Sequence, residues 1–195
     1  MDMAGNSGDL WVFGYGSLMW RPGFAFEERI QATVRGYHRS LCIYSHVHRG
    51  SPDRPGLVLG LDRGGTCRGV AFRVAAPMRN ATIAYLHERE QVTLVYREAN
   101  LAATLADGRR ASVLAYVVEP HHPQYAGRLP LAELLRLVRQ GAGVSGRNAD
   151  YVRNTHEHLI ALGIADRTLA AIIKELDADR SPAQTIVADP AGWSA

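Results

Sequence analysis

A single carboxylate, Glu90, occupies a helical position that the sequence pattern assigns to a buried face. The segment 77–90 predicts a helix, because a proline comes early in it and no glycine interrupts it. At spacings of i, i+3, i+4 and i+7, Glu90 shares one helical face with Ile83, Leu86 and His87. Burial of a charged carboxylate is costly and raises its pKa, which makes Glu90 a candidate general base. The alternative is a structural glutamate paired with an arginine such as Arg97 or Arg147.

The same helix projection sets expectations for the neighbours of Glu90. Glu88 and Arg89 point away from the apolar face. His87 is expected as a packed or hydrogen-bonded core histidine rather than as a catalyst, and Asn80 as a cap of the helix. Glu90 is therefore the group of this segment to which we assign chemistry.

A second chemical feature is a glycine-containing turn after a strand-like run, residues 10–13. The turn comprises Gly14, Tyr15, Gly16, Ser17, Leu18 and Met19. Glycine permits positive φ and close approach of the backbone, so such a turn can aim successive N–H groups at one point and bind an anion or an oxyanion. A hairpin turn that needs two glycines is the alternative, because short glycine motifs are weakly specific.

Arg49 opens a loop, residues 49–56, that contains two prolines and two glycines. Such a loop can wall a pocket and offer the guanidinium group to a carboxylate. It can equally be a rigid connection without a binding role, so both interpretations stay open.

The histidines and cysteines give no indication of a metal site or a nucleophile. Six of the histidines come in pairs: His46 and His48, His121 and His122, and His156 and His158. No HExxH or CxxC motif accompanies them, so we predict no metal. Cys42 and Cys67 lie in predicted strands and are expected as small core residues.

Composition excludes several classes of protein. The chain has 195 residues, 47% hydrophobic and 21% charged, with a net charge of +3, which suits one globular domain. No basic run interleaved with aromatic residues supports nucleic-acid binding, and no apolar run approaches the ~18 residues that span a membrane. Two cysteines make no disulfide framework, and the acidic start lacks the order of a signal peptide, so we expect a cytoplasmic protein. The sequence does not define the oligomeric state.

The elements that must position these residues are strands first and helices later, which favours an α+β fold. The expected strands are residues 32–37, 40–44, 57–61, 67–74, 96–105 and 110–118. Turns at 62–65 and 107–108 predict two hairpins among them. Later helices are expected over 131–140, from Asn148 as a cap to Gly163, and after Asp166 as a cap. We expect a flexible leader over 1–9, one domain over 10–180 and a tail over 181–195.

Four segments, in order along the chain, resemble signatures of the ChaC family, the glutathione-specific γ-glutamylcyclotransferases. Residues 11–20 resemble its substrate-binding signature, WVFGYGSLMW in this chain, and residues 49–56 resemble its RGxPxxPG loop. Residues 85–90, followed by Tyr96 and Arg97, resemble the segment that carries the catalytic glutamate. Residues 143–148, followed by Tyr151, resemble its GPSGRNxEYL element. The resemblance spans roughly residues 10–180.

The resemblance implies an α+β, γ-glutamylcyclotransferase-like fold with a mixed β-barrel core surrounded by helices. It also implies a reaction in which the γ-glutamyl amino group of glutathione attacks its own γ-carbonyl, giving 5-oxoproline and Cys-Gly. Glu90 is then the catalytic base, and the implied substrate-binding residues are Gly14, Tyr15, Gly16, Ser17, Leu18, Met19, Arg49, Tyr96 and Tyr125. For Tyr125, a tyrosine packed across the pocket rim is the alternative. The implied partner is a small molecule rather than nucleic acid or membrane, with no cofactor.

Two other functions remain open: a cyclotransferase for other γ-glutamyl amines or amino acids, and a non-catalytic regulatory binding protein of the same fold. A costly buried carboxylate at Glu90 argues against the second. The chain departs from the family at one place. Family members commonly carry a glycine between the catalytic glutamate and the next tyrosine, whereas residues 91–95 contain none.

Overall fold

The computed structural model of the chain describes residues 8–90 and 94–178, except for the side chain of Glu90. The main strands are β1 (Leu10–Gly14), β2 (Glu28–Ser45), β3 (Gly56–Val74), β4 (Tyr96–Leu105) and β5 (Arg110–Val118). The helices are α1 (Arg79–Glu90), α2 (Leu131–Gln140), α3 (Asn148–Ala161) and α4 (Arg167–Ala178). Shorter elements are the 3-10 helices η1 (Ser17–Met19) and η2 (Ala76–Met78) and the ribbon of β6 (Ala142–Gly143) and β7 (Gly146–Arg147). The expected leader and tail lie outside the described residues, apart from residues 8 and 9.

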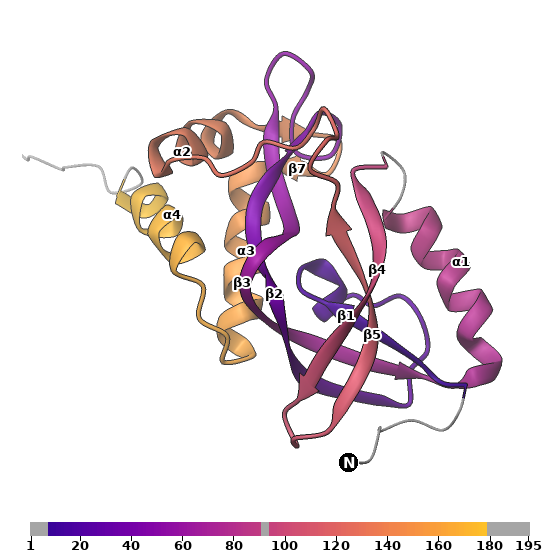
Figure 1. Cartoon of the computed structure of the whole chain (residues 1–195). Helices are drawn as coiled ribbons and strands as arrows, with labels where there is room; N and C mark the ends of the chain where they lie inside the picture. The colour runs from indigo at the N-terminus through magenta and orange to yellow at the C-terminus, as the bar shows by residue number, and fades with distance from the viewer. Residues whose placement is uncertain (1–7, 91–93, 179–195) are drawn as a thin grey trace, which may run out of the picture.

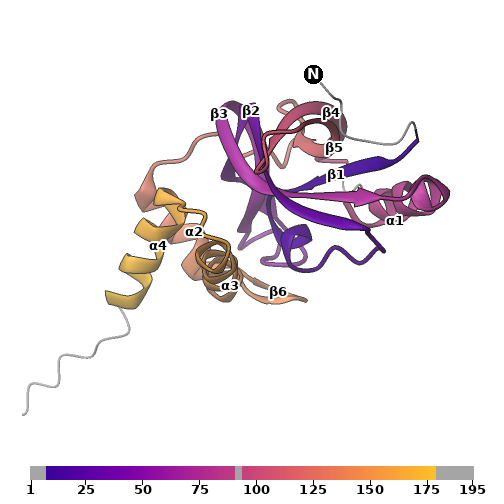
Figure 2. The ribbon, with the colours of Figure 1, turned by 90° about the horizontal axis from the view of Figure 1, so that it is seen from below.

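The main strands close into a barrel in the order β1-β3-β2-β4-β5 (Figure 1, Figure 2). Neighbouring strands run antiparallel except β1 and β5, which pair in parallel at Val12 and Leu114. Figure 1 shows α1 against one side of the barrel and α2, α3 and α4 grouped on the other. This architecture confirms the predicted α+β class with a mixed barrel core and helices around it.

Strand β1 is buried along its whole length, because both of its faces are covered. Trp11 and Phe13 belong to the main core, whereas the alternate residues Leu10 and Val12 belong to a second cluster that includes Leu86 of α1. Helix α1 therefore packs directly on the barrel wall. The turn with the candidate chemistry begins where β1 ends.

The region 57–74 is one long strand, so the hairpin predicted there is wrong. β3 pairs with β2 along its whole length, and the two form a single long hairpin (Figure 1). Gly64 and Gly65 of the predicted turn have positive φ values of 94° and 71°, and the pairing register with β2 shifts opposite them. These glycines make a bulge that bends the strand instead of reversing it. β2 likewise continues through the interruption expected at residues 38–39.

The other predicted hairpin and the C-terminal helices are confirmed. β4 and β5 pair around the turn at residues 107–108, and α2 and α4 lie where the apolar spacing placed them. The carboxylate of Asp166 accepts hydrogen bonds from the N–H groups of Thr168 and Leu169, both over 3.1 Å, and so caps α4 as predicted. No helix in the described part of the chain is long and apolar enough to cross a membrane.

Two predicted caps are wrong. Asn80 lies inside α1, which begins at Arg79. Asn148 is the first residue of α3 and makes no capping bond. Its fully buried carboxamide instead accepts a hydrogen bond from the N–H of Leu57 and donates one to the carbonyl of Leu57, each over 2.7 Å. Asn148 therefore fastens α3 to β3, the strand that borders the candidate site.

Candidate active site

The predicted turn leaves β1 at Gly14 and continues into η1. Neither Gly14 nor Gly16 has a positive φ, so a left-handed conformation is not the reason for these glycines. A Cβ at Gly14 would lie 3.0 Å from the Cβ of Leu18, which means that the turn packs on itself there. A Cβ at Gly16 would meet only Leu59 Cδ1, at 3.8 Å. Gly16 borders a cavity, so its missing side chain leaves room for a ligand.

Arginines hold the carbonyl side of this turn. The buried Arg39 donates to the carbonyl of Tyr15 over 2.5 Å, and Arg29 donates to the carbonyl of Met19 over 3.2 Å. No acceptor among the described residues meets the first two N–H groups of η1. The turn thus combines N–H groups that meet no acceptor in the described part of the chain with nearby positive charge, which is the arrangement that binds an anion or an oxyanion.

Two cavities adjoin at the turn. The smaller, of about 60 Å³, is lined by Tyr15, Gly16, Ser17, Leu18, Leu59, Tyr96, Tyr116 and Tyr151. The larger is a cleft of about 450 Å³, and it shares with the first the residues Ser17, Tyr96 and Tyr151. Basic or imidazole groups on its wall are Arg21, Arg49, Arg89, His46, His48 and His158, and none of its described lining residues is acidic. Of the predicted turn residues, Gly14 and Met19 line neither space and instead support those that do.

Tyr96 and Tyr151 approach the same residue of β3, Leu59. The Tyr96 hydroxyl donates to the carbonyl of Leu59 over 2.7 Å, and the N–H of Leu59 donates to the Tyr151 hydroxyl over 3.2 Å. Both rings line both cavities. The structure therefore brings Tyr96 beside the glycine turn, where a binding role for it remains a prediction.

Arg49 lines the larger cleft, in the position expected of a loop that walls a pocket. Its guanidinium group donates to the carbonyl of Ser145 and lies 5.1 Å from the centre of the Tyr151 ring. His48 is hydrogen-bonded through Nδ1 to the Ser145 hydroxyl, over 2.9 Å. These contacts hold the guanidinium at the cleft wall. Its contact with a substrate carboxylate remains a prediction.

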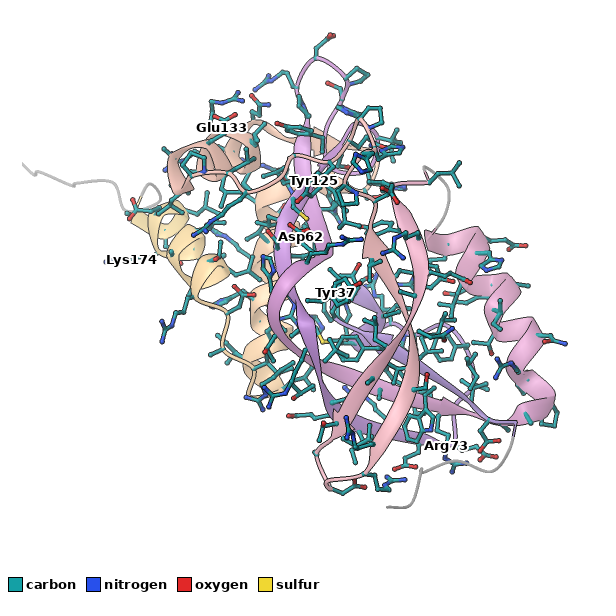
Figure 3. All side chains as sticks on the ribbon, viewed as in Figure 1. Tyr37, Asp62, Arg73, Tyr125, Glu133 and Lys174 are labelled. Atoms are coloured by element: carbon teal, nitrogen blue, oxygen red, sulfur yellow. The ribbon has the colours of Figure 1, made fainter. Side chains whose placement is uncertain are left out.

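Tyr125 is absent from the described residues that line the two cavities. Its hydroxyl donates to the carboxylate of Asp62 over 2.9 Å, and Figure 3 shows the two side chains close together. Burial, with a further contribution from Asp62, raises the pKa of Tyr125 to about 12. Its backbone pairs with Ile43, which does line the cleft. Tyr125 therefore contacts a residue of the cleft wall without lining the cleft itself. Its direct contact with the substrate remains a prediction.

The face of helix α1 that is turned toward the site differs from the predicted one, which was defined by Ile83, Leu86, His87 and Glu90. Leu86 is buried, but the His87 side chain is 45% exposed and pairs with Glu98, so its prediction as a core histidine is wrong. Arg89, expected to point away, is half-buried and donates to the Ser17 hydroxyl over 3.0 Å. Leu86 and Arg89, at i and i+3, therefore mark the buried face more closely than His87 does.

Glu90 is the last residue of α1 and directly follows Arg89. Its side chain and residues 91–93 lie outside the described residues, so its catalytic assignment stays a prediction. One arginine considered as its partner, Arg97, lies 3.8 Å from Glu119 in an ion pair, and the other, Arg147, is exposed. The bond from Arg89 to the turn places the end of α1 beside the small cavity.

Comparison with known proteins identifies the family. A family model for the ChaC-like protein matches residues 10–179. The chain belongs to the ChaC-like family. It is 33% identical over 180 residues to a glutathione-specific gamma-glutamylcyclotransferase of Escherichia coli K12, covering 91% of this chain and 78% of that protein. It is 36% identical over 177 residues to the human glutathione-specific gamma-glutamylcyclotransferase 1, covering 86% of this chain and 80% of that protein.

A solved structure shows the same fold. The crystal structure of a yeast γ-glutamylcyclotransferase specific to glutathione matches with a TM-score of 0.79, covering 88% of this chain and 96% of that one. Sequence identity to it is 20%. The ChaC-like chain therefore has the γ-glutamylcyclotransferase fold, as the sequence led us to expect.

Sequence reasoning missed several residues that this ChaC-like chain brings to the site: Arg39, Arg89, Glu98 and Tyr116. Arg89 carried a usable signal, because it lies three residues after the apolar Leu86. Tyr116 carried none, since it sits within the apolar run 113–118.

Both cysteines of this ChaC-like chain lie in the core, and one of its histidines stacks on an aromatic ring. Cys42 and Cys67 are buried as predicted, and burial raises the pKa of both thiols, that of Cys42 to about 12. Protonated buried thiols are poor nucleophiles. His158 stacks on Trp20 with 4.3 Å between ring centres. Within the described ranges, no three His, Cys, Asp or Glu side chains gather as metal ligands, and independence from metal stays a prediction.

Proposed function

We propose that this ChaC-like chain is a glutathione-specific γ-glutamylcyclotransferase, the activity named for its bacterial and human relatives. The observation that carries the proposal is the pair of adjoining cavities. A small space at the glycine turn suits a γ-glutamyl group, and a cleft walled by basic groups suits the Cys-Gly portion with its terminal carboxylate. Glutathione has this same division and is an anion, which such a wall attracts.

The proposed reaction is intramolecular and needs no co-reactant. The α-amino nitrogen attacks the γ-carbonyl carbon and forms the ring bond of 5-oxoproline. The bond from that carbon to the cysteinyl nitrogen then breaks and releases Cys-Gly. The substrate ammonium group loses two protons in becoming the lactam N–H, and the leaving nitrogen gains two in becoming an ammonium group, so protons balance without net release.

Each part of the site has a role in this proposal. Glu90 takes a proton from the attacking amine and returns it to the leaving nitrogen. The N–H donors of the turn stabilise the negative charge that develops on the carbonyl oxygen, or hold the α-carboxylate. Tyr96 shapes the pocket so that nitrogen and carbon meet, an orientation effect worth several kcal/mol in comparable intramolecular reactions. Arg49 binds a carboxylate of the substrate.

A broader cyclotransferase for other γ-glutamyl amines or amino acids is the nearest alternative. The basic cleft favours glutathione over the amines, because small γ-glutamyl amines lack a distant carboxylate. A non-catalytic binding protein is the alternative from another class. We propose a small-molecule substrate as the partner and the cytoplasm, where buried free thiols persist, as the location.

The test is to incubate the purified protein with glutathione in EDTA and to measure 5-oxoproline and Cys-Gly. We expect equal amounts of the two products, and a much slower reaction with γ-glutamyl-alanine, because remote contacts help to position the reacting centre. Equal kcat/KM for both substrates would favour the broader cyclotransferase. Binding of glutathione without any 5-oxoproline would favour the non-catalytic protein, and activity that EDTA abolishes and zinc restores would indicate a metal site.

A further inference from the structure

A further cavity, of about 620 Å³, shares no described lining residue with the two cavities of the proposed active site. Its lining comes from the β2–β3 hairpin, from helices α2 and α4 and from the segment before α2. Figure 1 shows these elements on the side of the barrel that faces away from α1. The volume lies in the range of small-molecule sites. A ligand bound here would therefore leave the proposed active site open.

The lining of this outer cavity is strongly basic. Its basic side chains are those of His38, Arg39, Arg63, Arg128 and Arg167. Asp62 is the single acidic residue among the described lining residues. Both of its carboxylate oxygens already accept hydrogen bonds, one from the Tyr125 hydroxyl over 2.9 Å and the other from the N–H of Arg63 over 2.8 Å. The outer cavity therefore carries a net positive charge.

The arginines of the outer cavity differ in how far the protein neutralises them. Arg39 is almost fully buried and lies 3.6 Å from the carboxylate of Asp166. The guanidinium groups of Arg63, Arg128 and Arg167 are exposed, and among the described residues none of the three has a hydrogen-bond acceptor or a carboxylate as a partner. Like charges gathered around one space repel each other, and a bound anion relieves that repulsion. Arginine is best suited to carboxylate and phosphate oxygens.

The remainder of the lining is largely apolar, and its main contributors lie in α2 and just before it. Leu129, Leu131 and Leu134 line the outer cavity. Leu134 belongs to the main core, whereas Leu131 is 41% exposed. A bare inorganic anion would leave this apolar surface in water. A ligand with an alkyl chain would cover it, and removal of apolar surface from water favours binding.

We propose that the outer cavity binds an amphipathic organic anion, with a phosphate or carboxylate head against the arginines and a short alkyl chain against Leu131. The head receives charge-assisted hydrogen bonds from guanidinium groups that have no described partner. The chain extends the contact onto the leucines. This ligand differs in chemical class from glutathione, so the site goes beyond the proposed function and does not depend on it.

The test is calorimetric titration of the purified chain with octyl phosphate, below the concentration at which it forms micelles. Inorganic phosphate keeps only the head of this probe, and octyl glucoside keeps only its tail. We expect octyl phosphate to bind at least about tenfold more tightly than either, because it alone satisfies both parts of the lining. Octanoate replaces the phosphate head by a carboxylate, and preferential binding of either amphipathic anion supports the proposal. Octyl phosphate and octanoate that bind no more tightly than inorganic phosphate or octyl glucoside overturn it.

Substitutions locate the bound anion. We expect Arg128→Gln and Arg167→Gln each to weaken octyl phosphate by about tenfold, because a charge-assisted hydrogen bond is lost. Leu131→Ser should weaken octyl phosphate but not inorganic phosphate. Arg79→Gln is the matched control, since Arg79 is an exposed arginine of α1 on the other side of the barrel (Figure 1). All four side chains are exposed, so these variants keep the core intact.

The basic cleft of the proposed active site is the competing location, and Arg49→Ala tests it. We expect this variant to bind octyl phosphate like the wild type. Weaker binding in Arg49→Ala together with unchanged binding in Arg128→Gln and Arg167→Gln would place the anion in the cleft and overturn the proposal. Equal affinity in all variants overturns it as well. None of these measurements uses glutathione turnover, so failure of the proposed function and failure of this site are separate results.

Discussion

The guanidinium group of Arg89 donates a hydrogen bond to the hydroxyl of Ser17 over 3.0 Å. The same group also donates to the backbone carbonyl of Arg21 over 2.6 Å, beyond the end of η1. One side chain thus joins the last turn of α1 to the glycine turn after β1. Because Glu90 follows Arg89, this bond fixes the spacing between the proposed base and the proposed binding turn.

We therefore expect Arg89→Ala to lower kcat for glutathione by roughly 10- to 100-fold, since small displacements of a catalytic group are costly. Steady-state kinetics with a parallel thermal melt measures this. The matched control is Arg79→Ala, an exposed arginine at the start of the same helix. Equal activity of the two variants would contradict a positioning role for Arg89.

The second prediction concerns the base itself. Glu90→Gln keeps the shape of the side chain and removes its ability to accept a proton. We expect a loss in kcat of at least ~10²-fold with substrate binding largely retained. Rate measurements combined with calorimetric binding of glutathione separate the two effects.

Glu88→Gln is the control for Glu90→Gln, because Glu88 is an exposed carboxylate on the same helix. It should leave the rate near that of the wild type. A folded Glu90→Gln protein with normal turnover would remove Glu90 from the mechanism.

The sequence predicted the fold correctly where the local turn and capping residues favour the same structure as the tertiary packing does. The hairpin of β4 and β5 and the Asp166 cap follow from turn and capping residues alone. The hairpin at residues 57–74 was not predictable in this way, because Gly64 and Gly65 serve equally for a turn and for a bulge. Only the long pairing partner, β2, decides between them, and a single segment does not contain that information.

The sequence predicted which segments form the site, but not which side chains contact one another within it. The glycine turn, Tyr96 and Arg49 line the two cavities, since their motifs are continuous in sequence. Tyr116 and Glu98 lie opposite each other on the neighbouring strands β4 and β5, but neither residue type indicates in the sequence that their side chains form a hydrogen bond. The helical face of α1 was misjudged because Arg89 is charged and half-buried, and a pattern built on apolar residues counts such a side chain as solvent-facing.

The two glycines of the turn should respond differently to substitution. A Cβ at Gly14 meets Leu18 Cβ at 3.0 Å and backbone of Met19 at 3.1 Å, so Gly14→Ala should destabilise the fold. A Cβ at Gly16 enters the small cavity and meets only Leu59 Cδ1. Gly16→Val should therefore abolish activity while the melting temperature stays near that of the wild type. Thermal melts and kcat/KM for both variants measure this, and an active Gly16→Val would show that the ligand binds elsewhere.

Leu94 has a backbone conformation that favours glycine, in a segment where this chain has none. Its φ is 56°, a left-handed conformation, and its side chain is 68% exposed. That conformation costs an L-residue about 1–2 kcal/mol, part of which glycine recovers. Leu94→Gly should raise the free energy of unfolding by up to about 1 kcal/mol in urea titrations, and Leu94→Val should lower it. A less stable Leu94→Gly together with an unchanged Leu94→Val would contradict the strain at this residue.

Arg49 should decide how the enzyme recognises the glycine end of glutathione. Its guanidinium group lies on the wall of the basic cleft, held by the Ser145 carbonyl and the Tyr151 ring. If it binds the terminal carboxylate, the wild type should prefer glutathione over its C-terminal amide by about tenfold in kcat/KM, because an arginine–carboxylate pair is a charge-assisted bond.

The variant Arg49→Ala should lose that preference, chiefly through a higher KM for glutathione, while its rate with the amide stays close to that of the wild type. Arg54→Ala, an exposed arginine of the same loop, should keep the preference. A preference that survives in Arg49→Ala would assign the carboxylate to another basic group of the cleft, and Arg21 is then the next to substitute, because it lines the same cleft.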